Sequence, residues 1–457
     1  MRKDMTAGTE WKQIALFSFP IMAGNILQQL YNTVDGIVVG NFVNESALAA
    51  VGTCGVLSFL FLSLSMGLGN GAGIMIAQFF GAKRMHELKS SMSTSLILLV
   101  SIGAVLSVFG IFAGRWLLSG LMNVKDPVIL DYAAVYFEIY AVGFILQFAY
   151  NAVAAILRAV GDSKATLLFL FVSAFLNLGL DLLFVITFNW GVAGAAVATV
   201  ISQVGSTVVS IIYMFRRYPQ FRFSKGEFVF DPDKGKLCLR LGIPTTIQQC
   251  IVSFGNVFIQ RLVNSFGSVT MAAYTVGSRI ENYLFVPTMG FFTGMSTFTA
   301  QNIGAGKIDR IKRGLVGTGV LSASVCIILS VSLYIFSEPV SRLFGVSDDA
   351  LAQAVEFCRF YSKIFILFAA YMPVNALLQG SGDVIYASST TMTTLIVRVA
   401  MAYVMALLLD VGYSSCWKST PIGWSAAVVM AFARYASGRW KTKSIVKRPA
   451  TDIELQM

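Results

Sequence analysis

The sequence predicts an all-α integral membrane protein with twelve transmembrane helices in two parallel-repeat lobes of six helices each. Three observations lead to this fold class. The 457 residues are 56% hydrophobic and 12% charged, with a mean hydropathy of +0.72, whereas a soluble protein is about 25% charged. Apolar runs of about 20 residues, long enough to cross a bilayer core of roughly 30 Å, recur along the whole chain. Landmarks of the first half also return in the second half.

The apolar runs define the expected helices. They are continuous rather than alternating, which argues against a β-barrel. The first ten residues are polar and the first run is too long for a signal peptide, so this run should be retained as the first spanning helix. The expected helices are 14–40, 48–79, 91–113, 131–157, 166–188, 192–215, 238–264, 271–301, 315–336, 355–379, 386–410 and 420–437.

The basic residues indicate how these helices are oriented. Most of the 34 Lys and Arg residues fall in the two termini and in the loops after even-numbered helices. The richest loop, residues 216–236, lies between helices six and seven. The positive-inside rule therefore predicts that both termini are cytoplasmic. The net charge of +11 then reflects topology rather than a nucleic-acid partner.

An internal duplication divides the chain into two halves. "QFFGAKRMHELK" at 78–89 corresponds to "QNIGAGKIDRIK" at 301–312, and each follows the second helix of its half. Two further pairs keep nearly the same offset: Pro20 with Pro244, and "ILRAVGD" at 156–162 with "LLQGSGD" at 377–383. Both halves start on the same side, so the repeat is parallel, about an axis along the membrane normal.

The predicted domains follow from the duplication. An N-terminal six-helix lobe covers 1–215, a cytoplasmic linker covers 216–237, and a C-terminal lobe with a basic cytoplasmic tail covers 238–457. Two similar bundles that face each other form a cleft, and rocking one against the other gives alternating access. The duplication therefore favours a transporter.

Several enzyme classes are excluded. The single histidine, His86, lies in the predicted loop after helix two, so neither a Ser-His-Asp set nor a zinc cluster is expected. "GAGK" at 304–307 lacks the upstream Gly and the following Ser or Thr of a P-loop. The six cysteines form no CxxC pair, so neither a metal site nor a disulfide framework is implied. Transport should be driven by an ion gradient, with no cofactor.

Polar residues inside the helices mark a candidate coupling site in the first half. Gln28, Asn32 and Asp35 fall at i, i+4 and i+7 on one face of helix one, and Asn177 and Asp181 are one turn apart on helix five. With Thr199 of helix six, the two acids lie in the outer halves of their helices. Hard oxygen ligands suit a small cation such as Na⁺, and two close carboxylates can instead share a proton.

Each of these polar residues can also have a purely structural role. Asn151 and Thr199 are of a type that often only bonds a neighbouring helix, whereas a buried acid without a partner is costly, which favours function for Asp35 and Asp181. In the second half, Glu281 with Arg279 and Arg261 forms a set of charges that is either structural or contributes to transport. Arg398, in the middle of helix eleven, has the same two interpretations.

Taken together, these features resemble the MATE (multidrug and toxic compound extrusion) transporters, particularly the DinF-like and MepA-like bacterial branch. The resemblance covers nearly the whole chain. It rests on Pro20, "VDGIVVGN" of helix one, "NLGLD" of helix five, "GAKR" and "GAGK", the two "GD" loops, and "PIGW" through "SGRWK".

The resemblance implies two six-helix lobes in a V and export of amphipathic cations against H⁺ or Na⁺. Asp35, Asn177, Asp181 and Thr199 match the family's N-lobe proton or cation site, and Gln28, Asn32 and Asn151 form the supporting network. Pro20 matches the proline at which helix one bends. The sequence departs from the NorM-like branch on helix seven, which has Gln260 and Arg261 but no acid.

The leading hypothesis is an antiporter in the plasma membrane of a bacterium. It acts as a monomer, and its partners are small cationic amphipathic substrates and membrane lipids. One alternative is a lipid-linked oligosaccharide flippase of the same superfamily. Such a flippase would favour a cleft with several cationic residues, and this sequence sets few Arg residues inside its predicted helices away from the basic loops, namely Arg261, Arg279 and Arg398, against two acids in the first half. The second alternative is a membrane scaffold or receptor that does not transport.

Overall fold

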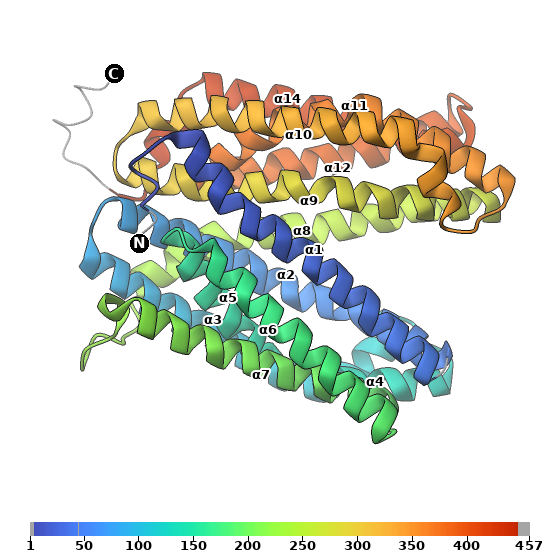
Figure 1. Ribbon diagram of the computed structural model, residues 1–457, viewed down its shortest axis with the longest axis horizontal. Coiled ribbons are helices and arrows are strands. Elements are labelled where there is room, and N and C mark those ends of the chain that lie inside the picture. Colours follow the sequence, from blue (N-terminus) through green and yellow to red (C-terminus); the bar gives the residue numbers. More distant parts are fainter. Residues whose placement is uncertain (1–3, 44, 447–457) are drawn as a thin grey trace. The chain divides into compact units, whose positions relative to one another are not determined.

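The computed structural model describes residues 4–43 and 45–446, and within these ranges the side chains of 31–41, 45 and 48 are not described. The described part is helical throughout (Figure 1). Its α-helices are α1 (Glu10–Phe42), α2 (Glu45–Gly81), α3 (Met85–Trp116), α4 (Pro127–Val142), α5 (Phe144–Ala159), α6 (Ser163–Asp181), α7 (Gly191–Arg217), α8 (Pro232–Ser265), α9 (Ser268–Gly304), α10 (Ile308–Arg342), α11 (Asp348–Gly380), α12 (Val384–Leu407), α13 (Ser415–Lys418) and α14 (Thr420–Ala436).

Every predicted span corresponds to one of these helices or to a broken pair of them. Seven helices of the described residues are long and apolar enough to cross a membrane, and α4 with α5 forms an eighth span that is bent by 45°. The run at 131–157 predicted one straight helix, but the structure breaks it at Gly143. A Cβ on Gly143 would meet the Oε1 atom of Gln203, from α7, so glycine leaves room for this side chain at the bend.

The chain folds into two compact units, and the division does not follow the predicted linker. Unit 1 contains residues 23–246 and unit 2 contains residues 4–22 and 247–446 of the described chain. The first part of α1 therefore packs in unit 2, and the first part of α8 packs in unit 1. The division passes close to Pro20 and Pro244, which lie inside these two helices. The predicted lobe boundaries themselves remain a prediction.

The first parts of α1 and α8 are the exchanged helix segments, because each packs in a different unit from the rest of its helix. Matching glycines explain how closely these segments pack. In unit 1, a Cβ on Gly71 would lie 2.6 Å from the backbone nitrogen of Gly242, so α8 can approach α2 this closely only at glycine. In unit 2, a Cβ on Gly294 would meet Ser18, so α1 approaches α9 in the same way. Gly71 and Gly294 occupy equivalent places in the two halves, and close helix packing is the role that small-xxx-small pairs play in membranes.

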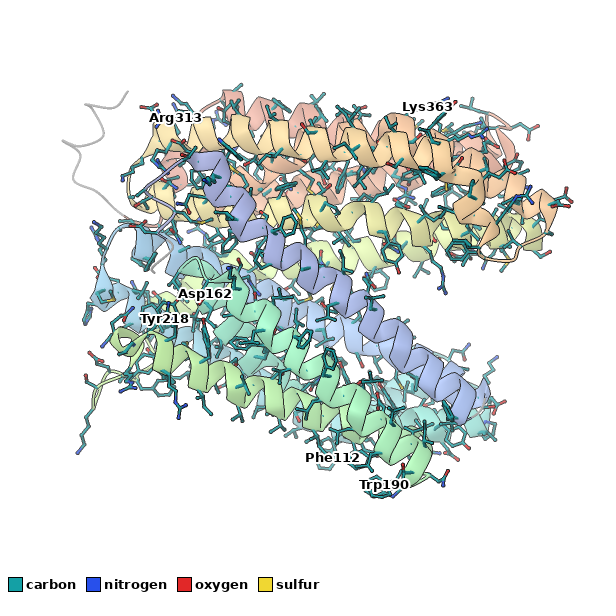
Figure 2. All side chains as sticks on the ribbon, viewed as in Figure 1. Phe112, Asp162, Trp190, Tyr218, Arg313 and Lys363 are labelled. Atoms are coloured by element: carbon teal, nitrogen blue, oxygen red, sulfur yellow. The ribbon has the colours of Figure 1, made fainter. Side chains whose placement is uncertain are left out.

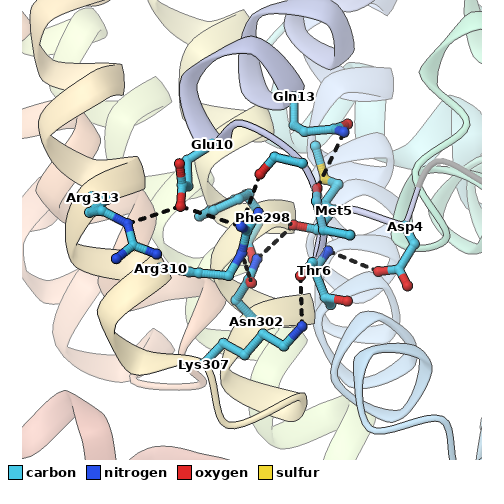
Figure 3. Close-up of polar contacts among 12 residues, drawn as sticks. Asp4, Met5, Thr6, Glu10, Gln13, Phe298, Asn302, Lys307, Arg310 and Arg313 are labelled. Atoms are coloured by element: carbon cyan, nitrogen blue, oxygen red, sulfur yellow. Dashed lines mark hydrogen bonds and ion pairs between the residues drawn. The ribbon is translucent and has the colours of Figure 1, made fainter.

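A short segment before each exchanged helix is held by polar contacts. In unit 2, residues 4–10 form an N-terminal strap that lies against the α9–α10 connection (Figure 3). The Met5 backbone nitrogen donates to Gln301 Oε1 at 2.9 Å, and Arg310 and Arg313 both contact the Glu10 carboxylate, at 3.3 and 3.0 Å. The strap thus fixes where α1 begins.

The equivalent segment in unit 1 is the end of the linker, residues 224–236. Lys89 Nζ donates to Glu227 Oε2 at 2.8 Å, and this hydrogen bond lowers the pKa of the Glu227 carboxyl from its ordinary value. Ser90 Oγ donates to Asp231 Oδ2 at 3.2 Å, and the Asp231 backbone nitrogen donates to Thr94 Oγ1 at 3.0 Å. In both units, therefore, a segment that carries acids anchors the start of the first helix of the other sequence repeat.

The aspartates of the two "GD" loops are satisfied by different partners. Asp162 Oδ2 accepts hydrogen bonds from Tyr213 at 3.0 Å and from Tyr218 at 2.9 Å. Asp162 and Tyr218 lie near the same end of unit 1 (Figure 2). Burial and the nearby Asp162 carboxylate raise the pKa of Tyr218. Asp383 instead forms a two-contact ion pair with Arg434, at 2.6 and 3.2 Å. The duplicated sequence positions thus keep their acids but use different structural partners.

Candidate functional site

In unit 1, α6 and α7 run side by side and bring three predicted site residues together (Figure 1). Asn177 and Asp181 are each 1% exposed and Thr199 is 6% exposed. When the Asn177 amide is oriented to satisfy both neighbours, its Nδ2 donates to Asp181 Oδ2 at 2.8 Å and its Oδ1 accepts from the Thr199 backbone nitrogen at 3.3 Å. The i, i+4 spacing that suggested a shared face therefore produces a contiguous polar cluster.

The other orientation of the same amide is also compatible with Thr199. Asn177 Nδ2 then donates to Thr199 Oγ1 at 3.4 Å, and its Oδ1 faces the carboxyl group of Asp181. Thr199 Oγ1 itself donates to the Ala195 carbonyl oxygen at 3.0 Å, which fixes the hydroxyl in position. The Asn177 amide therefore lies between an acid and a hydroxyl. Its Nδ2 has an acceptor in either orientation, Asp181 in one and Thr199 in the other.

A change of helix type follows Asp181. The α-helical part of this span ends at Asp181, and residues Leu182–Thr187 continue as a π-helix. Wide π-helical turns are rare and are frequently found at functional sites. Nothing in the sequence indicates this turn, because hydrophobic periodicity does not distinguish one wide turn within a largely apolar helix.

The residues predicted on helix one are described only in part. The side chains of Asn32 and Asp35 lie outside the described residues, so their roles remain predictions. Gln28 is exposed on α1. Pro20 lies inside α1, which is helical through that point, and the predicted bend there also remains a prediction.

Asn151 has a definite partner elsewhere in the unit. Its Nδ2 donates to Ser65 Oγ at 2.9 Å and so joins α5 to α2. This is the interhelical bond that was considered as its structural alternative. The predicted supporting residue Asn151 is thus tied to α2, apart from the coupling residues Asn177, Asp181 and Thr199, among which Asn177 contacts both others.

The charged residues predicted in the second half do not form one group. Arg261 and Arg279 are on exposed parts of α8 and α9, whereas Glu281 is buried, with 7% exposed. Residues two apart on a helix point in nearly opposite directions, which separates Arg279 from Glu281. The charge that interacts with Glu281 is instead Arg398, from α12. Sequence spacing could not reveal this, because it depends on how distant helices pack.

Comparison with known proteins agrees with the helical fold and the duplication. The family model MatE matches residues 20–183 and 244–404, one range in each half of the chain. The chain belongs to the MATE family. It is therefore a membrane transporter and not an enzyme, and the predicted class of fold is confirmed.

Individual relatives cover almost the full length of this MATE transporter. It is 30% identical over 449 residues to "Probable multidrug resistance protein YoeA" of Bacillus subtilis, which covers 96% of each chain. It is 28% identical to "Probable multidrug resistance protein YpnP" of the same species, covering 97% of this chain and 98% of the relative. A crystal structure of a MATE protein in complex with MaL6 aligns with a TM-score of 0.90 at 25% identity, covering 96% and 99% of the two chains.

Proposed function

We propose that this chain is a secondary active exporter that moves small amphipathic organic cations out of the cell in exchange for entering protons. It would belong to the DinF-like and MepA-like branch, which the missing acid on helix seven supports. The names of the relatives at about 30% identity support drug-like substrates. The acids of the N-terminal half favour cationic substrates over the anionic pyrophosphates of a lipid flippase.

The observation that carries proton coupling is the Asn177 amide between Asp181 and Thr199. An ionised Asp181 carboxylate accepts from Asn177 Nδ2 at 2.8 Å. A protonated Asp181 can donate its O–H to Asn177 Oδ1 once the amide has turned over, and Nδ2 then donates to Thr199 Oγ1, at 3.4 Å. Each protonation state of Asp181 thus has its own hydrogen bonds, which lowers the cost of changing its charge in a buried site.

Sodium coupling would require a different use of the same residues. Na⁺ binds oxygen ligands, so the Asn177 carbonyl and the Thr199 hydroxyl would have to converge on the ion together with the Asp181 carboxylate. The amide orientation that satisfies both neighbours directs N–H, not C=O, at Asp181. This geometry favours H⁺ over Na⁺, with Asp35 as the second acid that the sequence predicts.

The test is drug accumulation in bacterial cells with and without the protein. Cells that make it should accumulate less of a fluorescent organic cation, and a protonophore should remove this difference while omission of Na⁺ should not. Loss of the difference on Na⁺ omission alone would replace H⁺ by Na⁺. No difference in accumulation would point to the flippase or to a protein that does not transport drugs.

We also propose that both termini and the 216–236 loop are cytoplasmic, because this side holds most of the basic residues. Lys225→Cys and Lys125→Cys provide a matched pair, since both lysines are exposed and lie in loops predicted on opposite sides. In a Cys250→Ser background, an impermeant thiol reagent added to intact cells should label Cys at 125 only. Labelling at 225 from outside would reverse the topology.

A further inference from the structure

The linker between α7 and α8 carries exposed apolar side chains beside exposed basic ones. Phe228 and Val229 are 53% and 59% exposed, although they lie in a loop between helices. Arg222 and Lys225 are exposed in the same loop. These four residues are the linker surface, and they have no part in the Asp181 site. Apolar side chains next to Lys and Arg are typical of segments that lie in the surface of a membrane.

The linker surface continues an outward apolar stripe of α7. The large exposed residues of this helix recur every three or four positions, so they lie on one face, and they are between 39% and 47% exposed: Ile201, Val204, Val208 and Ile212. Because α7 is long and apolar enough to span a membrane, this face meets lipid. Phe215 comes next along the stripe. Its ring meets Phe223 edge-on at a centroid distance of 6.1 Å, and Phe223 meets Phe228 in the same way at 5.2 Å.

A tight turn fixes the basic tip of the linker surface. The Ser224 backbone nitrogen donates to Glu227 Oε2 at 2.7 Å, and the Glu227 backbone nitrogen donates to the Ser224 carbonyl oxygen at 3.0 Å, so residues 224–227 close a β-turn. Gly226 has a φ of +90°, which the third position of a type II turn requires. Lys89 of α3 donates to Glu227 at 2.8 Å and holds the turn. The turn lies beyond the end of α7 and to one side of it, with Lys225 at its tip (Figure 1).

The charges of the linker surface indicate an anionic partner. The neighbouring acids Glu227 and Asp231 accept hydrogen bonds from side chains of α3, whereas the basic side chains are exposed. Arg222 Nε donates to the Phe215 carbonyl oxygen at 3.1 Å, which fixes this side chain at the end of α7. A phospholipid offers a phosphate in its headgroup and hydrocarbon directly below it. An acidic soluble protein would match the charges but not their continuity with the lipid-facing stripe.

We propose that the linker surface lies on the membrane and binds anionic phospholipids. Arg222 and Lys225 meet the headgroup phosphates, and Phe228 enters the layer below them. Each Lys or Arg close to an anionic membrane surface strengthens binding by about fivefold. Residues 224–236 also hold the first part of α8, so bound lipid fixes the start of this helix at the membrane surface.

The experiment measures contact between the linker surface and each of two lipids, in nanodiscs that hold the purified full chain. A bimane fluorophore is attached to Val229→Cys in a Cys250→Ser background, since the other five cysteines are buried. The Val229 carbonyl oxygen keeps its hydrogen bond from Ser93, at 2.9 Å. The discs contain equal amounts of phosphatidylglycerol and phosphatidylcholine, and one of the two carries a nitroxide on its acyl chain near the glycerol. Both lipids should quench the bimane, and phosphatidylglycerol should quench it more strongly.

Two variants separate the charge from the apolar contact. Lys225→Gln should lower the preference for phosphatidylglycerol about fivefold, because one basic residue leaves the anionic surface. Phe228→Ser should lower quenching by both lipids. A bimane on Lys125→Cys, an exposed position in a loop predicted on the opposite side, is the control and should respond to neither variant.

The possible outcomes are distinct. Absence of quenching by either lipid would overturn the membrane contact and leave the linker surface to a soluble partner. Equal quenching by the two lipids, or a preference for phosphatidylglycerol that Lys225→Gln does not change, would overturn the binding of anionic lipid by this surface. The measurement needs neither drug nor proton gradient, so its result is independent of the proposed antiport.

Discussion

Replacing Asp181 with Asn is expected to abolish proton-coupled efflux while the protein still inserts in the membrane. The side chain is 1% exposed and forms a cluster with Asn177 and Thr199. Asn is nearly isosteric but cannot gain or lose a proton, so the site would be held in one charge state and would lose its response to pH. The measurement is efflux of a cationic dye after an imposed pH jump in proteoliposomes, with the amount of reconstituted protein determined for each variant.

The surface acid Asp131 provides the control for this substitution. Asp131 pairs with Arg115 at 2.7 Å on an exposed part of unit 1, so Asp131→Asn should leave efflux unchanged. Asp35→Asn should cause the same loss as Asp181→Asn if both acids serve one site. Retention of pH-driven efflux in Asp181→Asn, at wild-type protein levels, would show that coupling occurs elsewhere.

The order and approximate limits of the helices were predictable because a bilayer imposes a length on each apolar run. The details within the spans were not. The 45° break lies at Gly143, where Gln203 of α7 takes the place that a side chain would need, and the π-helix after Asp181 lies in the apolar stretch Leu182–Thr187. Both features are set by packing between helices, to which periodicity along one segment is insensitive.

The sequence indicates more of the cluster around Asp181 than of the surroundings of Glu281 and Arg398. Asn177 and Asp181 are one turn apart on one helix, so their shared face follows directly from the sequence, and the predicted proximity of Thr199 agrees with the structure. Glu281 and Arg398 lie on α9 and α12, and only the packing of those helices brings their charges together. Sequence proximity suggested Arg279 as a companion of Glu281, and the structure places Arg279 on an exposed part of α9.

Removing the Glu281 charge and removing the Arg398 charge should lower the stability of the folded protein by unequal amounts. Glu281→Gln removes the carboxyl whose charge offsets the buried Arg398 guanidinium, which cannot discharge, and an uncompensated buried charge costs about 3 kcal/mol. Arg398→Met leaves a glutamic acid that can remain protonated, so the charge disappears and the cost should be smaller. The double substitution removes both charges and should recover most of the stability that Glu281→Gln loses.

The measurement is the rate of thermal inactivation in one detergent at one pH, because membrane proteins of this size often unfold irreversibly. Glu281→Gln should be the fastest of the three variants to inactivate, and the double variant should be slower. Raising the pH should speed the inactivation of Arg398→Met, since its lone acid is then driven toward the charged form, while the double variant should show no such response. Equal rates for the two single variants, or a double variant as unstable as the sum of both, would mean that the two charges do not compensate each other in the folded protein.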